Sequence, residues 1–167
     1  MSYRILIVCS GNTCRSPMAK AMLEDAIAKT GLEVEVDSAG TSGIQAGEPM
    51  DRRAIAALGE FGISPGAHCA RHVTIADLAG ADLVITMTAA HFGALHGLAP
   101  DGATMTNLRL LRSFDPDCAA SNPIDGSIDV ADPYSGTQDD YRNCVRQIKA
   151  ALPGILQYVA SELGQAH

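Results

Sequence analysis

The sequence predicts an α/β protein in which helices cover both faces of a parallel β-sheet. Three observations support this fold class. Short apolar segments alternate with segments of helical periodicity along the chain. Hydrophobic residues make up 47% of the 167 residues, aromatic residues only 4%, and Trp is absent, which is typical of aliphatic packing in a helix-rich α/β protein. The first apolar segment also leads through a short loop directly into a helical pattern.

The individual elements follow from local patterns. Strands are expected at 3–8, 33–37, 82–86 and, on a less regular pattern, 104–110. Helices are expected at 17–29, 50–60, 75–79 (a short turn), 88–96 and about 138–163. Segments 38–49 and 113–137 have loop composition, and a loop as long as the second is usually functional. With neither an internal repeat nor a linker, residues 1–167 are expected to form a single domain.

Charge and cysteine usage restrict the classes of partner. A net charge of −7 argues against a general nucleic-acid or anionic-membrane binder. No segment approaches membrane-spanning length, and the first apolar run is too short for a signal peptide. The five cysteines form an odd set, which fits a reducing compartment, so a cytoplasmic location is expected. No Cys pair has zinc-site spacing, and His68 and His72 follow a Pro-Gly start that does not favour a metal-binding helix, so neither a metal nor a cofactor is expected.

One segment carries most of the chemical information: Cys9-Ser10-Gly11-Asn12-Thr13-Cys14-Arg15-Ser16, directly after the apolar run Ile5-Leu6-Ile7-Val8. A loop between a strand and a helix N-terminus directs backbone N–H groups at an anion, and the helix dipole favours negative charge there. The same field favours a thiolate, so Cys9 is a candidate nucleophile. Arg15 has a planar guanidinium that can bind two oxygens of a phosphoryl group. The motif therefore predicts a phosphate-binding loop after the first strand.

The residues that follow favour this interpretation over two others. Ser16 is suited to the N-cap and Pro17 to the first helical position, and Ala19, Leu23 and Ile27 then share one helix face. A cysteine beside an apolar run is ordinarily an inert core residue, which would not need this strand, loop and helix context. A Walker-type loop would end in Gly-Lys-Ser or Gly-Lys-Thr, and the segment has no such ending.

Cysteine-based dephosphorylation also requires a proton donor for the leaving group, because the loop offers only cationic and neutral donors. Asp115 and Asp132 are the candidates, since each precedes a proline that stiffens a loop. An Asp-Pro pair is also typical of an ordinary turn. Spacing alone does not choose between the two.

A family resemblance distinguishes between Asp115 and Asp132. Residues 8–19 resemble the signature of the low-molecular-weight protein tyrosine phosphatase family, and residues 128–136 resemble its general-acid loop. Residues 36–40 and 68–74 also resemble segments of that family. The similarity covers essentially the whole chain, and the two catalytic motifs are specific in combination. It implies a three-layer α/β/α fold with a four-stranded parallel sheet.

The resemblance also implies roles for individual residues. Cys9 would form a cysteinyl-phosphate, Arg15 would bind and stabilise the transferring phosphoryl group, and Asp132 would protonate the leaving group and then activate water. Asp115 would be structural. The phosphate would be surrounded by Ser10, Gly11, Asn12, Thr13, Cys14, Arg15 and Ser16. The loop would be supported by a hydrogen-bonded network in which Asn12 is left-handed and Ser16 stabilises the thiolate, with the members Asn12, Ser16, Ser38 and His68.

Three positions depart from the phosphotyrosine-directed members. Thr13 stands where those members usually carry Ile, and Ile44 lies where some carry Trp. Tyr134 is followed by Ser135, where many have a second aromatic residue. The pattern Gly-Asn-Thr-Cys-Arg-Ser-Pro with a single aromatic after Asp-Pro is similar to the protein arginine phosphatase branch. We therefore expect phosphoarginine to be favoured over phosphotyrosine, with a tyrosine phosphatase as the alternative.

The sequence disfavours two further functions. Arsenate reductases share this fold and loop, but their disulfide relay needs a closely spaced downstream pair, whereas Cys69, Cys118 and Cys144 are far apart. A non-catalytic phosphate-binding module would be expected to lack Cys9 or Asp132, and both are present.

The resemblance and the motif also predict the partners and the redox behaviour of the protein. Phosphorylated proteins are the expected partners, and the chain is expected to be a monomer or weak dimer. Cys9 and Cys14, five residues apart in a curved loop, are expected to form a reversible disulfide that protects the nucleophile.

Overall fold

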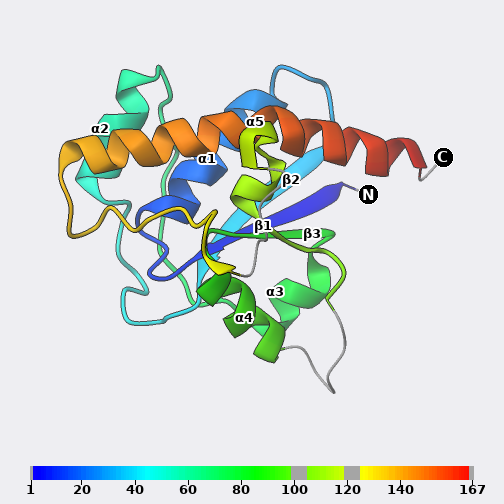
Figure 1. The fold of residues 1–167 in the computed structure, drawn as a ribbon, viewed down its shortest axis with the longest axis horizontal. Helices are drawn as coiled ribbons and strands as arrows, with labels where there is room; N and C mark the ends of the chain where they lie inside the picture. Colours follow the sequence, from blue (N-terminus) through cyan, green and yellow to red (C-terminus); the bar gives the residue numbers. More distant parts are fainter. Residues whose placement is uncertain (1, 99–104, 119–124, 166–167) are drawn as a thin grey trace.

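The central feature of the fold is a parallel β-sheet (Figure 1). The computed structural model describes residues 2–98, 105–118 and 125–165. Within these residues the sheet has the strand order β2-β1-β3-β4, in which β1 is Tyr3–Cys9, β2 is Val34–Gly40, β3 is Leu83–Thr86 and β4 is Leu108–Leu110. β1 is paired on both sides, with Cys9 opposite Gly40 on β2 and Val8 opposite Thr86 on β3. The predicted four-stranded parallel sheet is confirmed.

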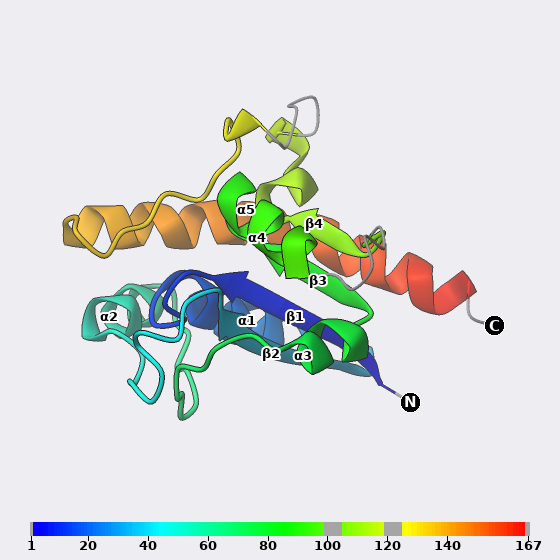
Figure 2. The same cartoon turned by 90° about the horizontal axis from the view of Figure 1, so that it is seen from below.

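Helices cover both faces of this sheet, as Figures 1 and 2 show. One face is covered by α1 (Arg15–Ile27) and α5 (Gln138–Gln165), with α2 (Arg52–Glu60) packed against them, and the other by α3 (Ile75–Gly80) and α4 (Ala89–Leu98). Side chains of β1 alternate between the two cores, because successive residues of a strand point to opposite faces. Ile5 and Ile7 pack in the core that contains α1 and α5, whereas Leu6 and Val8 pack in the core that contains α3 and α4. The predicted three-layer α/β/α arrangement is confirmed.

The strand order places the carboxyl end of β1 at a switch point. From β1 the chain passes through α1 to β2 on one side, while β3 lies on the other side of β1 and continues into α4. Ligands of open α/β sheets bind in the crevice that such a divergence leaves at the carboxyl ends of strands. The loop that follows β1 lines a pocket at this place.

Two predicted boundaries are wrong because the phosphate loop determines them. α1 begins at Arg15 rather than at residue 17, and Cys14 rather than Ser16 precedes it. The hydroxyl of Ser16 contacts Cys9 instead of capping the helix. β2 continues to Gly40, so residues 38–40 of the predicted loop 38–49 belong to a strand, since they pair with the end of β1.

The other differences are at element ends. The predicted strand 104–110 is a strand only at Leu108–Leu110, and its residue 104 lies outside the described residues. The predicted loop 113–137 contains two short 3-10 helices at its start, η2 (Leu111–Phe114) and η3 (Pro116–Cys118), and its residues 119–124 are likewise outside the described part. α4 and α5 each extend two residues beyond their predicted ends. None of the described helices is long and apolar enough to cross a membrane.

Candidate active site

The phosphate loop, residues 9–16, is held from the outside by its carbonyl oxygens. Those of Cys9, Ser10 and Thr13 accept hydrogen bonds of 2.8 to 3.0 Å from backbone N–H groups of residues 41, 42 and 51. In a trans peptide unit the N–H points away from the C=O, so the N–H groups that follow these carbonyls point to the inner side of the loop. Converging N–H groups at the start of a helix form an anion-binding site.

Asn12 is the centre of the network that shapes this loop. It is fully buried and has a φ of 60°, the left-handed conformation that the sequence analysis expected. Its Nδ2 donates to Ser16 Oγ at 2.8 Å and to Ser38 Oγ at 3.0 Å. Its backbone oxygen accepts from His68 Nε2 at 2.6 Å, and its Oδ1 accepts from the N–H of Arg71 at 3.0 Å. The structure therefore brings together all four members of the expected network.

Cys9 is the last residue of β1, and its side chain is buried at the base of the loop. Its Sγ lies 3.0 Å from Ser16 Oγ. Ser16 Oγ accepts a hydrogen bond from Asn12, and its own proton has two acceptors within reach, this sulfur and the backbone oxygen of Ala39 at 3.5 Å. The contact with Cys9 places the Ser16 hydroxyl directly beside the sulfur of the candidate nucleophile.

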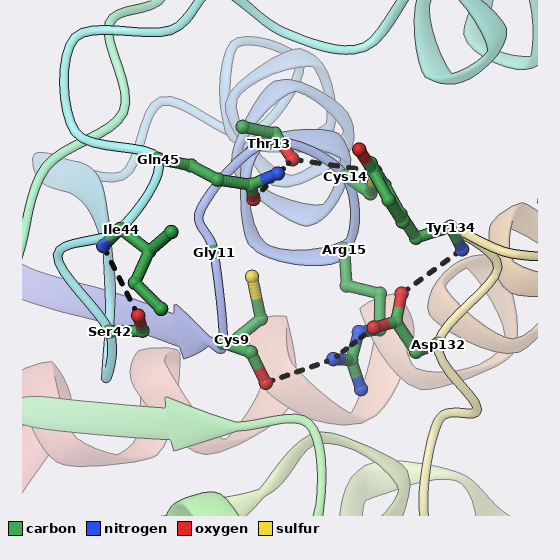
Figure 3. Close-up of a pocket in the computed structure, with 11 residues that line it drawn as sticks. Cys9, Gly11, Thr13, Cys14, Arg15, Ser42, Ile44, Gln45, Asp132 and Tyr134 are labelled. Carbon is green, nitrogen blue, oxygen red and sulfur yellow. Dashed lines mark hydrogen bonds and ion pairs between the residues drawn. The ribbon is translucent and has the colours of Figure 1, made fainter.

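The guanidinium of Arg15 connects the phosphate loop with the loop that follows η3. Its Nη1 donates to the backbone oxygen of Val130 at 2.9 Å, and its Nη2 lies 3.5 Å from Asp132 Oδ2. Nη2 also donates to Ser10 Oγ at 3.4 Å. The Arg15 side chain is only 5% exposed, so these contacts, rather than solvent, set its orientation. Figure 3 shows Arg15 and Asp132 side by side, across the pocket from Ile44 and Ser42.

These groups share one cavity of about 220 Å³ at the carboxyl end of β1 (Figure 3). It is lined by residues of the phosphate loop, the segment after β2 and the loop before α5: Cys9, Ser10, Gly11, Thr13, Cys14, Arg15, Ser42, Ile44, Gln45, Asp132 and Tyr134. The loop residues Asn12 and Ser16 lie behind this wall, where both are fully buried.

The two candidate acids occupy different environments. Asp132 lines the pocket with a half-exposed side chain, and its Oδ1 accepts from the N–H of Tyr134 at 3.1 Å. Asp115 is buried outside this pocket, where its carboxylate accepts from the N–H of Asp117 at 3.0 Å and contacts the sulfur of Cys118. Asp115 thus stabilises the start of η3, and only Asp132 faces Arg15.

Three side chains expected to affect specificity, those of Thr13, Ile44 and Tyr134, form the outer wall of the pocket. Thr13 is buried except for 7% of its surface, and its Oγ1 donates to Gln45 Oε1 at 3.2 Å. Tyr134 is half-exposed and is the one aromatic side chain of this lining, while Ile44 is almost fully exposed. The Gln45 amide lies against Gly11, where any Cβ would clash with it.

Sequence reasoning missed two residues that line the pocket and one that contacts the phosphate loop from behind it. Ser42 and Gln45 lie in the segment after β2, whose small and polar composition indicated a loop without indicating which side chain would reach the pocket. His91, near the start of α4, has its Nε2 2.7 Å from Ser10 Oγ. A lone histidine in an apolar helix gives no sequence signal for such a contact.

The thiols of Cys14 and Cys144 are protonated at neutral pH. Burial raises the pKa of Cys14, whose sulfur lies 3.4 Å from the hydroxyl of Tyr141. Burial also raises the pKa of Cys144 to about 12 and raises that of the Tyr141 hydroxyl. All five cysteines are free.

A Cys-x5-Arg loop at the carboxyl end of a central parallel strand, with an aspartate facing its arginine, defines the class of cysteine-based phosphatases. The family model described as "Low molecular weight phosphotyrosine protein phosphatase" matches residues 4–165. The chain belongs to this family and is a cysteine-based phosphatase.

Individual relatives agree with this assignment. A low molecular weight protein-tyrosine-phosphatase of Streptomyces coelicolor is 40% identical over 165 residues, which cover 98% of this chain and 97% of that protein. The crystal structure of YfkJ from Bacillus subtilis is similar with a TM-score of 0.84 and 32% identity, covering 97% of each chain. The YwlE arginine phosphatase from Geobacillus stearothermophilus is similar with a TM-score of 0.80 and 30% identity, covering 99% of this chain and 97% of that one.

Proposed function

We propose that this enzyme removes phosphate from phosphorylated protein side chains through a cysteinyl-phosphate on Cys9. The observation that carries the proposal is that one pocket holds the Cys9 thiol, the Arg15 guanidinium and the Asp132 carboxylate, with loop N–H groups directed inward. In-line displacement at phosphorus asks mainly for positioning and charge stabilisation, which this set supplies.

The reaction would proceed in two steps. In the first, the Cys9 thiolate attacks phosphorus, the bond from phosphorus to the leaving atom breaks, and protonated Asp132 gives its proton to that atom. In the second, the Asp132 carboxylate takes a proton from water, whose oxygen attacks phosphorus and breaks the S–P bond. Inorganic phosphate, the Cys9 thiolate and protonated Asp132 result. In both steps Arg15 and the loop N–H groups bind the equatorial oxygens of the transferring group.

Acceptor groups in the pocket wall support our proposal that phosphoarginine is the preferred substrate. The wall beside the loop is rich in hydrogen-bond acceptors: the oxygen of Thr13, the amide oxygen of Gln45 and the carboxylate of Asp132. A guanidinium presents several N–H donors in one plane, so such acceptors complement it. An Ile in place of Thr13 would remove the acceptor at position 13. The similarity to the YwlE arginine phosphatase supports the same assignment.

Phosphotyrosine is the second candidate, and a specific observation favours it too. Tyr134 and Ile44 provide one aromatic and one aliphatic side chain at the pocket wall, where a phenyl ring could pack. The relative from Streptomyces coelicolor is named a protein-tyrosine-phosphatase. The leaving atom is nitrogen in phosphoarginine and oxygen in phosphotyrosine. The pocket wall would contact a polar guanidinium group in the first substrate and an uncharged phenyl ring in the second.

The mechanism is tested first. Cys9→Ser should abolish turnover of any phosphate monoester with the fold intact, because an alcohol is a far weaker nucleophile at neutral pH. Asp132→Asn should lower the rate on an unactivated substrate by on the order of 10²–10⁴-fold. Asp115→Asn is the matched control and should leave the rate near that of the wild type. Acid quenching during turnover should trap phosphate on the peptide that contains Cys9. Phosphate on another residue, or loss of rate in Asp115→Asn instead, would contradict the mechanism.

The substrate is tested by parallel assays on one peptide carrying either phosphoarginine or phosphotyrosine. We expect a higher kcat/KM for phosphoarginine, and we expect Thr13→Ile to reverse the preference. The ratio of the two activities is the informative quantity, because a change in the folded fraction cancels in it. A wild-type preference for phosphotyrosine, or a Thr13→Ile variant that changes both activities equally, would favour the tyrosine assignment.

Two expectations on context belong to the same proposal. The five free thiols fit a reducing compartment, so we propose that the enzyme works in the cytoplasm. We also propose a monomer or weak dimer, which light scattering during size-exclusion chromatography would establish.

A further inference from the structure

His91 lies behind the active site rather than in it. It belongs to α4, on the face of the sheet opposite to α1, and only 5% of its surface is exposed. It does not line the pocket that contains Cys9. Its Nε2 nevertheless lies 2.7 Å from the hydroxyl oxygen of Ser10, the residue that directly follows the nucleophile.

The Ser10 hydroxyl lies between two nitrogen groups. Its oxygen accepts a hydrogen bond from Nη2 of Arg15 at 3.4 Å and is in contact with Nε2 of His91. A hydroxyl can donate one hydrogen bond while it accepts others. When Nε2 of a neutral His91 accepts the Ser10 proton, the hydroxyl cannot rotate, and a lone pair of its oxygen stays directed at Arg15.

The electrostatics of His91 agree with this arrangement. Burial and, secondarily, the Arg15 guanidinium lower the pKa of His91 to about 4, against a smaller opposing effect of Asp132. The imidazole is therefore neutral at physiological pH and places no second cation beside Arg15. Its Nδ1 is buried and has no hydrogen-bond partner among the described residues. An apolar side chain would avoid that cost, so the contact at Nε2 is what the histidine contributes.

We infer that His91 is a positioning residue for phosphoryl transfer: it fixes the Ser10 hydroxyl, which holds Nη2 of Arg15 in the orientation that meets the transferring phosphoryl group. This inference rests on the proposed function, because that function places the phosphoryl group against Arg15. His91 is not an acid or base of the reaction, since its side chain does not line the pocket.

The experiment uses the full chain with four variants and one control. His91→Leu removes the hydrogen bond, His91→Gln keeps a polar group near the position of Nε2, Ser10→Ala removes the intermediate hydroxyl, and the fourth variant combines His91→Leu with Ser10→Ala. His96→Leu, on the same helix, is the matched control, because His96 stacks on Phe92 and does not contact the loop. For each protein we would measure kcat and KM on an aryl phosphate, inhibition by orthovanadate and by inorganic phosphate, and the melting temperature.

We expect His91→Leu and Ser10→Ala each to lower kcat/KM by roughly tenfold, and the double variant to be no worse than either alone. Inhibition by orthovanadate should weaken more than inhibition by inorganic phosphate, because five-coordinate vanadate mimics the transition state that an oriented Arg15 binds. His91→Gln should recover most of the activity, and His96→Leu should match the wild type.

Two outcomes would overturn the inference in an active enzyme. One is wild-type kcat/KM in His91→Leu and Ser10→Ala. The other is multiplication of their effects in the double variant, which would mean that His91 does not act through Ser10. If His91→Leu fails to fold, the same multiplication test applies to His91→Phe and Ser10→Ala with their double variant, because Phe keeps a ring but has no nitrogen for the Ser10 hydroxyl. Failure of the proposed function is a separate result, since the wild type itself would then not hydrolyse the aryl phosphate.

Discussion

Cys14 places a second thiol in the pocket of the nucleophile. Its raised pKa keeps it protonated, so it does not compete with Cys9 for the phosphoryl group. A sulfenic acid on Cys9 would condense with this thiol to a disulfide and release water, which prevents further oxidation. Protection of Cys9 against irreversible oxidation is therefore expected to depend on Cys14.

We predict that peroxide inactivates the wild type in a way that a dithiol reverses, whereas Cys14→Ser recovers less activity. Cys69→Ser is the control, because Cys69 is an exposed thiol outside the pocket. Residual activity after peroxide and then dithiol treatment is the measurement. Equal recovery in Cys14→Ser and the wild type would remove the protective role.

His91 also makes stability depend on pH. The unfolded chain takes up a proton on this residue below its ordinary pKa of about 6.5, whereas burial and Arg15 hold the native pKa at about 4. The unfolded state binds more protons between these values, so the free energy of unfolding falls as the pH falls through this window. The pKa difference corresponds to about 3 kcal/mol.

We therefore predict that the free energy of unfolding of His91→Gln decreases less than that of the wild type between pH 7 and pH 4. Urea denaturation at several pH values in this range measures it. Parallel pH profiles of the two proteins would show that His91 does not titrate in this way.

At the scale of elements, the end of β2 supports the phosphate loop. A Cβ at Gly40 would clash with the carbonyl oxygen of Ser10 and lie 3.1 Å from that of Ser42. Both oxygens are backbone atoms, so relief would require the loop itself to move. The strand therefore ends in a residue without a side chain where the loop passes over it.

We predict that Gly40→Ala lowers the free energy of unfolding by about 1–3 kcal/mol and also lowers kcat. Gly59→Ala in α2 is the control: nothing lies within 4 Å of its added Cβ, and alanine favours a helix. Urea denaturation and aryl phosphate hydrolysis measure both effects. A Gly40→Ala variant with wild-type stability would show that the loop tolerates the shift.

The same region shows where local sequence rules fail. Ser16 has the right residue type for an N-cap, but its hydroxyl contacts Cys9 and Asn12, so the needs of the loop determine where α1 begins. Ser38, Ala39 and Gly40 have the composition of a loop. Gly40 lies against the backbone of the phosphate loop, Ser38 accepts a hydrogen bond from Asn12 in that loop, and all three form a strand because β1 pairs with them.

At the scale of the whole molecule, hydrophobic periodicity was sufficient to predict the order of strands and helices, and the strand-loop-helix context was sufficient to locate the phosphate loop. The choice of Asp132 as proton donor required the family resemblance, because Asp115 and Asp132 each precede a proline and spacing does not distinguish them. Gln45 and His91 could not be predicted, since each reaches the loop from an element far away in the sequence. Local patterns carry no information on such contacts.

The position of β1 in the chain determines when the active site can be assembled. β1 precedes the other described elements along the chain, yet the pocket at its end takes side chains from segments far later in the sequence, including Asp132 and Tyr134. Arg15 is itself oriented by the backbone oxygen of Val130. A nascent or truncated chain that ends before this loop carries the nucleophile but no assembled site. A chain that ends before this loop is therefore expected to lack phosphatase activity even where β1 and α1 fold.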